Sequence, residues 1–208
     1  DEGLASWVAA RVAGKPGIPR RAAAIHALDP VQLDLLVEDD RWIAERDIAQ
    51  PYPLGIVFVE ALDEAGGVRV RSCVLREIGA LGHREIAGLA LWVTVADRCG
   101  FVLEDVFARF ERLLEDAAAD LPPLPELEAS LQGTALRVVD RREAGFRLVC
   151  RFRSRPDAEV GTYEHVDVVD GRCELPLWQL PEETFGYQVG FRMDDDAVFD
   201  RWVEAPTP

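Results

Sequence analysis

The stretch D-L-P-P-L-P-E-L, residues 120–127, separates two parts of the chain that follow different sequence patterns. Its three prolines exclude a helix and favour an extended spacer. Apolar residues recur mainly at helical spacing before this spacer and alternate with polar residues after it. We therefore predict an α+β protein: a helix-rich part with one β-hairpin (residues 1–120), a Pro-rich linker (121–130), and a mainly antiparallel β part with a short terminal helix (131–208). One continuous domain is the alternative, in which the hairpin of the first part joins the later strands.

The first part is predicted to combine several helices with one hairpin. Apolar spacing predicts helices within the first 50 residues, over Glu85–Arg98 and over Leu103–Ala119. The segment 85–98 is apolar on nearly every side, which predicts a central position. Two β-branched runs, residues 54–62 and 68–75, flank the loop D-E-A-G-G and predict the hairpin.

The second part is predicted to consist of antiparallel strands. Residues 135–140 and 146–153 predict a hairpin, and residues 187–192 predict a further strand. One face of the strand at 146–153 carries three arginines: Arg147, Arg151 and Arg153. Acidic residues before A-V-F-D-R-W favour a helix N-terminus and predict a short helix around Val198–Trp202.

The stretch Y-E-H-V-D-V-V-D-G-R-C-E-L, Tyr163–Leu175, predicts a hairpin that turns at Asp170 and Gly171. The dipeptide D-G is typical of a two-residue turn in which both residues take positive φ. In this register Asp167 lies opposite Glu174. Alternation then places four apolar side chains on one face: Val166, Val168, Cys173 and Leu175.

The opposite face of this hairpin holds the candidate catalytic residues: Tyr163, His165, Asp167 and Glu174. A histidine beside two facing carboxylates is a pattern suited to proton transfer or to a divalent metal ion. The alternative is an exposed sheet face whose acids are neutralised by the three arginines at 147, 151 and 153. Those arginines are also the candidates for binding an anionic ligand. We favour neutralisation and predict neither a metal site nor a cofactor.

Other motifs in the chain are incomplete. Residues 82–88 contain the H-x-E of zinc deaminases, but no P-C-x-x-C follows. Residues 14–19 contain glycine and lysine without the order of a phosphate-binding P-loop. No serine lies in G-x-S-x-G, and the acids at 194–200 lack the glycine and terminal glutamate of an EF-hand. His26, on an alanine-rich segment, is predicted to be a packing residue.

The amino-acid composition limits the kinds of partner and the cellular compartment that we expect for this protein. The formal net charge of −15 opposes binding to nucleic acid. Four cysteines without a C-x-x-C pair predict neither a dense disulfide framework nor a zinc ribbon, so we expect a cytoplasmic protein. No apolar run approaches the roughly 20 residues that cross a bilayer. Abundant arginine and alanine with a single lysine are typical of a high-GC bacterial genome.

These observations predict a non-enzymatic bacterial accessory or interaction protein. Its acidic surface and exposed strand edges would recognise a protein partner that has a basic surface. The alternative is an enzyme or a small-ligand-binding protein with a polar site around His165, Asp167 and Glu174. A third hypothesis is an acidic mimic of nucleic acid. We expect neither nucleic acid nor a membrane as a partner, and the sequence is compatible with a homo-oligomer.

Overall fold

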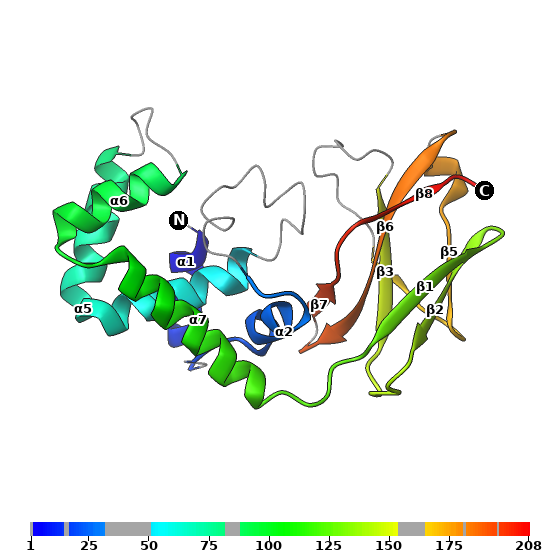
Figure 1. Cartoon of the computed structure of the whole chain (residues 1–208), viewed down its shortest axis with the longest axis horizontal. Helices are drawn as coiled ribbons and strands as arrows, with labels where there is room; N and C mark the ends of the chain where they lie inside the picture. The colour runs from blue at the N-terminus through cyan, green and yellow to red at the C-terminus, as the bar shows by residue number, and fades with distance from the viewer. Residues whose placement is uncertain are drawn as a thin grey trace. The chain divides into compact units, whose positions relative to one another are not determined.

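The chain contains helices followed by antiparallel sheets (Figure 1), and is therefore a mixed α+β protein. The computed structural model describes residues 2–14, 17–31, 51–81, 88–153, 165–180, 182–194 and 196–208. Contacts between residues divide it into two compact units. The described residues up to Asp120 form the helical unit, and those from Leu121 onward form the β unit.

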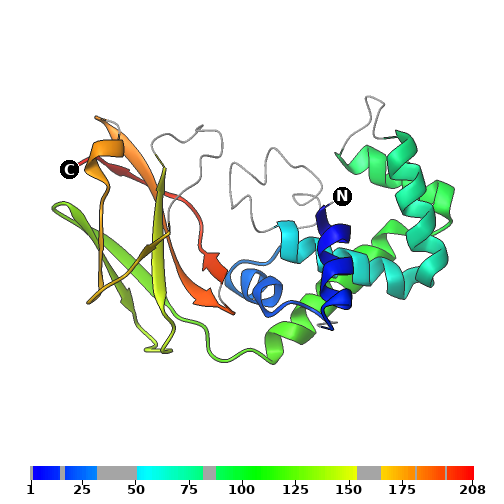
Figure 2. The ribbon, with the colours of Figure 1, turned by 180° about the vertical axis from the view of Figure 1, so that it is seen from behind.

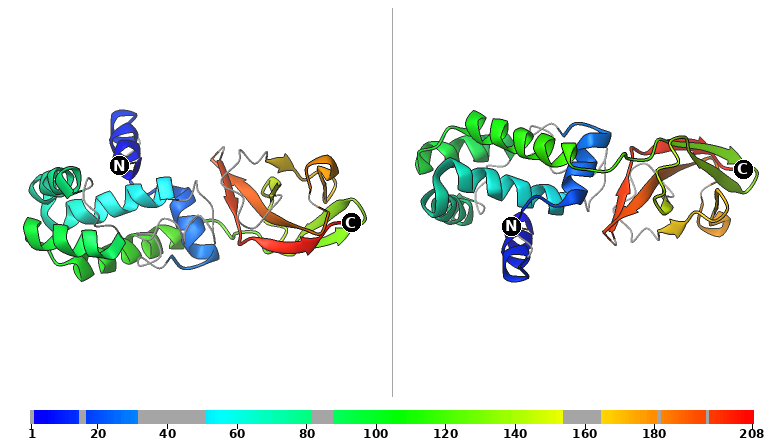
Figure 3. Two further views of the ribbon diagram at one scale, coloured as in Figure 1. Left: turned by 90° about the horizontal axis from the view of Figure 1, so that it is seen from above. Right: turned by 90° about the horizontal axis from the view of Figure 1, so that it is seen from below.

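The helical unit is built around two long helices that pack together. Its elements are α1 (Glu2–Val12), α2 (Arg20–Leu28), α5 (Pro51–Leu81), α6 (Gly88–Cys99) and α7 (Leu103–Ala119). Helix α7 has the predicted bounds and buries Val106, Phe110 and Leu114. Helix α1 crosses α5 (Figure 3), and the guanidinium groups of Arg11 and Arg71 lie 4.3 and 4.5 Å from the Trp7 ring centroid. No described helix is long and apolar enough to cross a membrane.

The hairpin predicted at residues 54–75 is wrong, because this segment belongs to α5. Its buried residues recur at helical spacing: Leu54, Val57, Phe58, Ala61 and Leu62. The Gly66–Gly67 pair that suggested a loop forms a kink, where Gly67 has φ of 60° and ψ of −153°. Glycine adopts this conformation readily and other residues rarely do. Burial of the helical face therefore outweighs the β propensity of the valines and isoleucine.

The position of α6 differs from the prediction, whereas helices do occur within the first 50 residues. Helix α6 is not central, since Leu89 and Val93 on its surface are exposed. The helices predicted within the first 50 residues are observed as α1 and α2, and the stretch 32–50 lies outside the described residues.

The β unit is a sandwich of two antiparallel sheets (Figure 2). Its strands are β1 (Leu127–Gln132), β2 (Ala135–Asp140), β3 (Leu148–Arg153), β4 (Val166–Asp167), β5 (Arg172–Glu174), β6 (Thr184–Met193), β7 (Asp196–Phe199) and β8 (Val203–Pro206). One sheet has the order β1-β2-β5; the other has the order β4-β3-β6-β7, with β8 also paired to β6. Buried side chains from both sheets form one core: Leu136, Val138, Cys150, Phe152, Cys173, Leu175, Phe185, Tyr187 and Val189.

Three predictions for the β unit are corrected. The terminal helix around 198–202 is wrong, because β7 and β8 pair with β6 and the chain ends in strands. Residues 135–140 and 146–153 are strands, but they do not pair with each other: β2 lies between β1 and β5, and β3 between β4 and β6. Part of the predicted linker is strand β1.

All four cysteines form disulfides. Cys73 pairs with Cys99 and joins α5 to α6. Cys150 pairs with Cys173 and joins β3 to β5, and so connects the two sheets. The wide spacing in sequence concealed both pairs, because each depends on contacts between separate elements.

Candidate functional site

The turn at Asp170 and Gly171 has the predicted geometry. Their φ angles are 50° and 73°. Val169 and Arg172 face each other and exchange two backbone hydrogen bonds of 2.9 Å. The predicted apolar face is also confirmed, since Val166, Val168, Cys173 and Leu175 all contribute to the sandwich core.

Beyond this turn the two strands separate into different sheets, so the predicted facing of Asp167 and Glu174 is wrong. Asp167 on β4 lies opposite Val149 of β3, whereas Glu174 on β5 lies opposite Ala135 of β2. Because their sequence neighbours face the core, the two carboxylates project from opposite outer faces of the sandwich. Tyr163 lies outside the described residues.

Asp167 forms ion pairs with two arginines. Its carboxylate accepts a hydrogen bond from Arg147 and another from Arg192, the latter over 3.5 Å. The hydrogen bond from Arg147 lowers the pKa of Asp167 below its ordinary value, and the charge of Arg192 contributes. Arg147 thus neutralises this acid, whereas Glu174 lies 4.0 Å from Arg172 on the other sheet.

Arg151 lies on the same face of the five-stranded sheet as Asp167, the face that points away from the sandwich core, and its side chain is buried there. It is 5% exposed, and its Nε donates to the Gln188 side-chain oxygen over 2.6 Å. Gln188 is 0% exposed and donates from Nε2 to the Asp200 carbonyl over 2.6 Å. A buried arginine needs such partners, because an unpaired buried donor is costly. The hydrogen bonds connect β3, β6 and the residue after β7.

Aromatic rings pack around these arginines. The Arg151 guanidinium lies 4.4 Å from the Phe199 ring centroid and 5.1 Å from that of Trp202. Arg153 lies 4.4 Å from the Trp202 ring and pairs with Glu204. The His165 ring packs against Phe199, with the two ring centroids 5.0 Å apart. Such cation–π contacts are worth about 0.5–2 kcal/mol each and hold the sheet face together.

The structure therefore gathers His165, Asp167 and the three arginines on one sheet face but engages them with neighbouring side chains. No group of three or more metal-ligating side chains occurs among the described residues. Sequence reasoning missed Gln188, Arg192, Phe199 and Trp202. The alternation of β6 could have placed Gln188 and Arg192 on one face, but nothing local shows that β6 lies beside β3.

A second candidate surface is the exposed side of α7. We define the acidic face of α7 by six exposed carboxylates: Glu104, Asp105, Glu111, Glu115, Asp116 and Asp120. None of the six forms an ion pair with a basic side chain of the described chain. The exposed Arg112 within this face pairs instead with Glu64 of α5. At 1.5 Å per residue the acidic face extends about 24 Å along the helix.

Helix stability accounts for only some of these acids. Glu104 and Asp105 in the first turn favour the helix dipole, but Asp116 lies in the last turn, where no basic residue is present. Glu111 and Glu115 are four residues apart, and such like-charged pairs destabilise a helix by about 0.2–0.5 kcal/mol. The charges of Glu111, Glu115 and Asp116 therefore do not stabilise α7 through the helix dipole or through each other.

His26 lies close to this face, on helix α2. Its Nδ1 accepts a hydrogen bond from the Val31 N–H over 3.2 Å. Burial lowers the pKa of His26, while the nearby carboxylates of Glu115 and Glu111 act in the opposite direction. Protonation at Nδ1 would also remove the acceptor. His26 thus serves to connect the end of α2 to the following segment.

Acidification is expected to weaken the helical unit through His26. Because the folded-state pKa lies below the ordinary value of about 6.5, the unfolded chain binds more protons in the window just below that pH. The contribution of neutral His26 is complete above about pH 6.5 and is lost as the pH falls through the folded-state pKa. Urea unfolding of the wild type and of His26→Gln at several pH values would measure this. The difference between their free energies of unfolding should become smaller as the pH falls. An imidazole titration by NMR with a midpoint above the ordinary value would contradict this.

Comparison with protein-family models, with curated proteins and with solved structures finds no match to this chain. Any functional conclusion therefore depends on the residues themselves.

Proposed function

We propose that this chain is a non-enzymatic interaction protein that binds a protein partner with a basic surface through the acidic face of α7. The observation that carries the proposal is the set of six carboxylates, spread over the exposed side of α7, without ion-pair partners in the described chain. Exposed carboxylates that lack an ion-pair partner favour an external counter-charge. A complementary row of lysine or arginine side chains would supply it and would speed association.

The ion pairs of the β unit support the same proposal. Asp167 is paired with Arg147 and Arg192, and Arg153 is paired with Glu204. Asp167, one of the residues considered for catalysis, thus stabilises a sheet face, and Glu174 lies on the other sheet. No specific observation favours the enzymatic alternative.

The cellular setting is part of the proposal. Bacterial origin and a cytoplasmic location follow from composition alone and stay predictions. The two disulfides are more typical of an oxidising compartment, so we infer that the protein acts where at least one of them forms. Nucleic acid is not proposed as a partner, because the net charge of −15 would repel a phosphate backbone.

Charge reversal on the acidic face is expected to weaken partner binding strongly. The double substitution Glu111→Lys with Glu115→Lys exchanges two carboxylates for two ammonium groups and leaves one like-charged pair at the same spacing, so the helix should stay folded. Immobilised wild-type chain should retain a lysine- and arginine-rich protein from the source lysate at low salt and release it by about 0.5 M salt. The double variant should retain about tenfold less of that protein.

The matched control is Glu182→Lys with Glu183→Lys, which makes the same change of charge at exposed positions of the β unit. It should retain the partner as the wild type does. Equal loss in both double variants would show a response to net charge alone. Retention that is insensitive to salt would exclude the acidic face as the binding surface.

A further inference from the structure

The two disulfides lie in different surroundings. Cys150 and Cys173 are both 0% exposed, within the core between the two sheets. In the helical unit Cys99 is 3% exposed, whereas Cys73 is only half-buried. Of the four cysteines, Cys73 is therefore the one that a thiol reagent in water can approach most readily.

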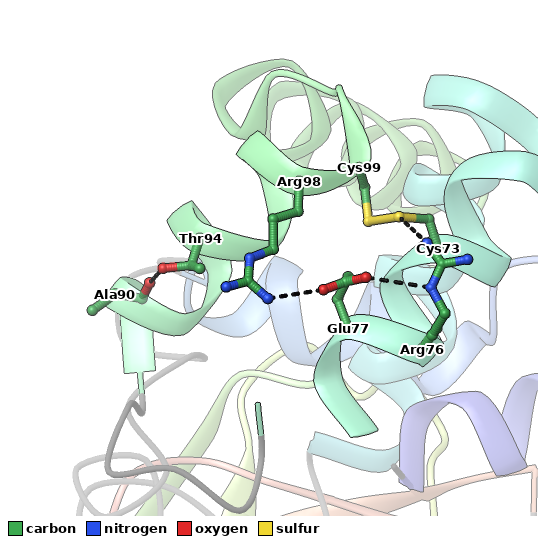
Figure 4. Close-up of polar contacts among 7 residues, drawn as sticks. All are labelled: Cys73, Arg76, Glu77, Ala90, Thr94, Arg98 and Cys99. Carbon is green, nitrogen blue, oxygen red and sulfur yellow. Dashed lines mark hydrogen bonds and ion pairs between the residues drawn. A yellow bond between two sulfur atoms is a disulfide. The ribbon is translucent and has the colours of Figure 1, made fainter. Parts of the chain in front are cut away.

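An arginine lies directly beside the accessible sulfur. Arg76, one turn further along α5, directs its Nη2 to Cys73 Sγ over 3.5 Å (Figure 4). Its side chain is 72% exposed, and its guanidinium group carries a positive charge next to the sulfur. A cation beside a cysteine stabilises the thiolate over the thiol. No described basic group is hydrogen-bonded to the sulfurs of Cys150 or Cys173.

A second connection between α5 and α6 does not involve sulfur. Glu77 accepts hydrogen bonds from Arg76 over 3.3 Å and from Arg98 of α6 over 3.0 Å (Figure 4). The hydrogen bond from Arg98 lowers the pKa of Glu77, so the carboxylate stays ionised under mildly acidic conditions. The rings of Phe58 and Trp92 also join the two helices, with centroids 4.7 Å apart.

We propose that the Cys73–Cys99 disulfide is a reversible redox lock between α5 and α6, opened by a dithiol reductant that attacks Cys73, while Cys150–Cys173 stays closed. The inference is independent of the proposed partner. It follows from the access to Cys73, the position of Arg76 and the presence of other contacts that keep α6 in place.

The exchange proceeds in two balanced steps. A thiolate of the reductant attacks Cys73 Sγ, the bond between the two cysteine sulfurs breaks, and Cys99 leaves with the electron pair and takes up a proton. The second thiolate of the reductant then attacks the reductant sulfur that is bonded to Cys73. This closes a disulfide within the reductant and releases Cys73 as a thiolate beside Arg76. The dithiol loses two electrons and becomes a disulfide, and the cysteine pair gains them. Because Arg76 stabilises the released thiolate, it favours the reduced state.

Opening should loosen α6 without unfolding the unit. Once the sulfurs separate, the Glu77–Arg98 ion pair and the Phe58–Trp92 contact still hold the helix against α5. We therefore expect faster amide hydrogen exchange across Gly88–Cys99 in the reduced protein and little change in α7. Such local opening is the behaviour of a weakly held element in a folded protein.

The test titrates the full chain with mixtures of reduced and oxidised dithiothreitol, quenches with acid, alkylates the thiols and measures each cysteine by mass spectrometry. Cys73 and Cys99 should open at a reduced-to-oxidised ratio at least about tenfold lower than Cys150 and Cys173. Arg76→Gln should raise the ratio needed by about fivefold, and Arg76→Lys should restore most of the wild-type value. The matched control is Arg69→Gln at an exposed position of α5, which should leave the ratio unchanged.

Three outcomes would overturn the proposal. The first is that Cys150 and Cys173 open at the same ratio or more easily. The second is that Arg76→Gln leaves the ratio for Cys73 and Cys99 unchanged. The third is that hydrogen exchange across α6 is the same in the oxidised and reduced protein.

Discussion

Replacing Gln188 with leucine is expected to lower the free energy of unfolding of the β unit by about 2–4 kcal/mol. Gln188 is 0% exposed, accepts from Arg151 and donates to the Asp200 carbonyl. Leucine fills a similar volume but leaves the Arg151 Nε and the Asp200 oxygen without these bonds inside the protein. The loss should exceed that of an ordinary hydrogen bond, because one of the two groups is charged.

Urea unfolding followed by near-ultraviolet circular dichroism would measure this loss, since the affected arginine packs against Trp202. The matched control is Gln132→Leu, the same substitution at an exposed position of β1, which should change the free energy by less than about 0.5 kcal/mol. If both substitutions had equally small effects, the buried arginine would depend on other partners, and Gln188 would lose the role assigned to it.

The β unit contains features that the sequence predicts and features that it does not. The turn at Asp170–Gly171 and the apolar face beside it were predictable, because both depend on residues close together in the chain. The separation of β4 and β5 into different sheets was not, because it depends on pairing with β3 and β2. A hairpin that opens between two sheets has the same local sequence as one that continues in a single sheet.

Helices α5 and α7 show the same distinction. In α7 strong helix formers and a single apolar stripe agree, and the predicted bounds are those observed. In α5 the β-branched residues and the G-G pair favoured a hairpin, although the buried positions from Leu54 to Leu62 already followed helical spacing. Local propensity and apolar period conflicted there, and the period was the better guide because burial contributes more energy.

Truncating Phe110 is expected to have the largest effect on the helical unit. Phe110 is 0% exposed, and its ring centroid lies 6.3 Å from that of Phe58 on α5. Phe110→Ala removes a buried ring and leaves a cavity, so the free energy of unfolding should fall by about 3–5 kcal/mol. Phe110→Leu keeps most of the volume and should cost less than about 1.5 kcal/mol.

Urea unfolding followed by circular dichroism at 222 nm measures both substitutions, with Phe107→Ala as the control. Phe107 is half-buried on the same helix and also contacts Phe58, so its truncation should cost clearly less. A Phe110→Ala loss below about 1 kcal/mol would show that the packing of α7 does not depend on this residue. The result bears on function as well, because the acidic face lies on the exposed side of α7 and its attachment to the protein depends on the buried side of the same helix.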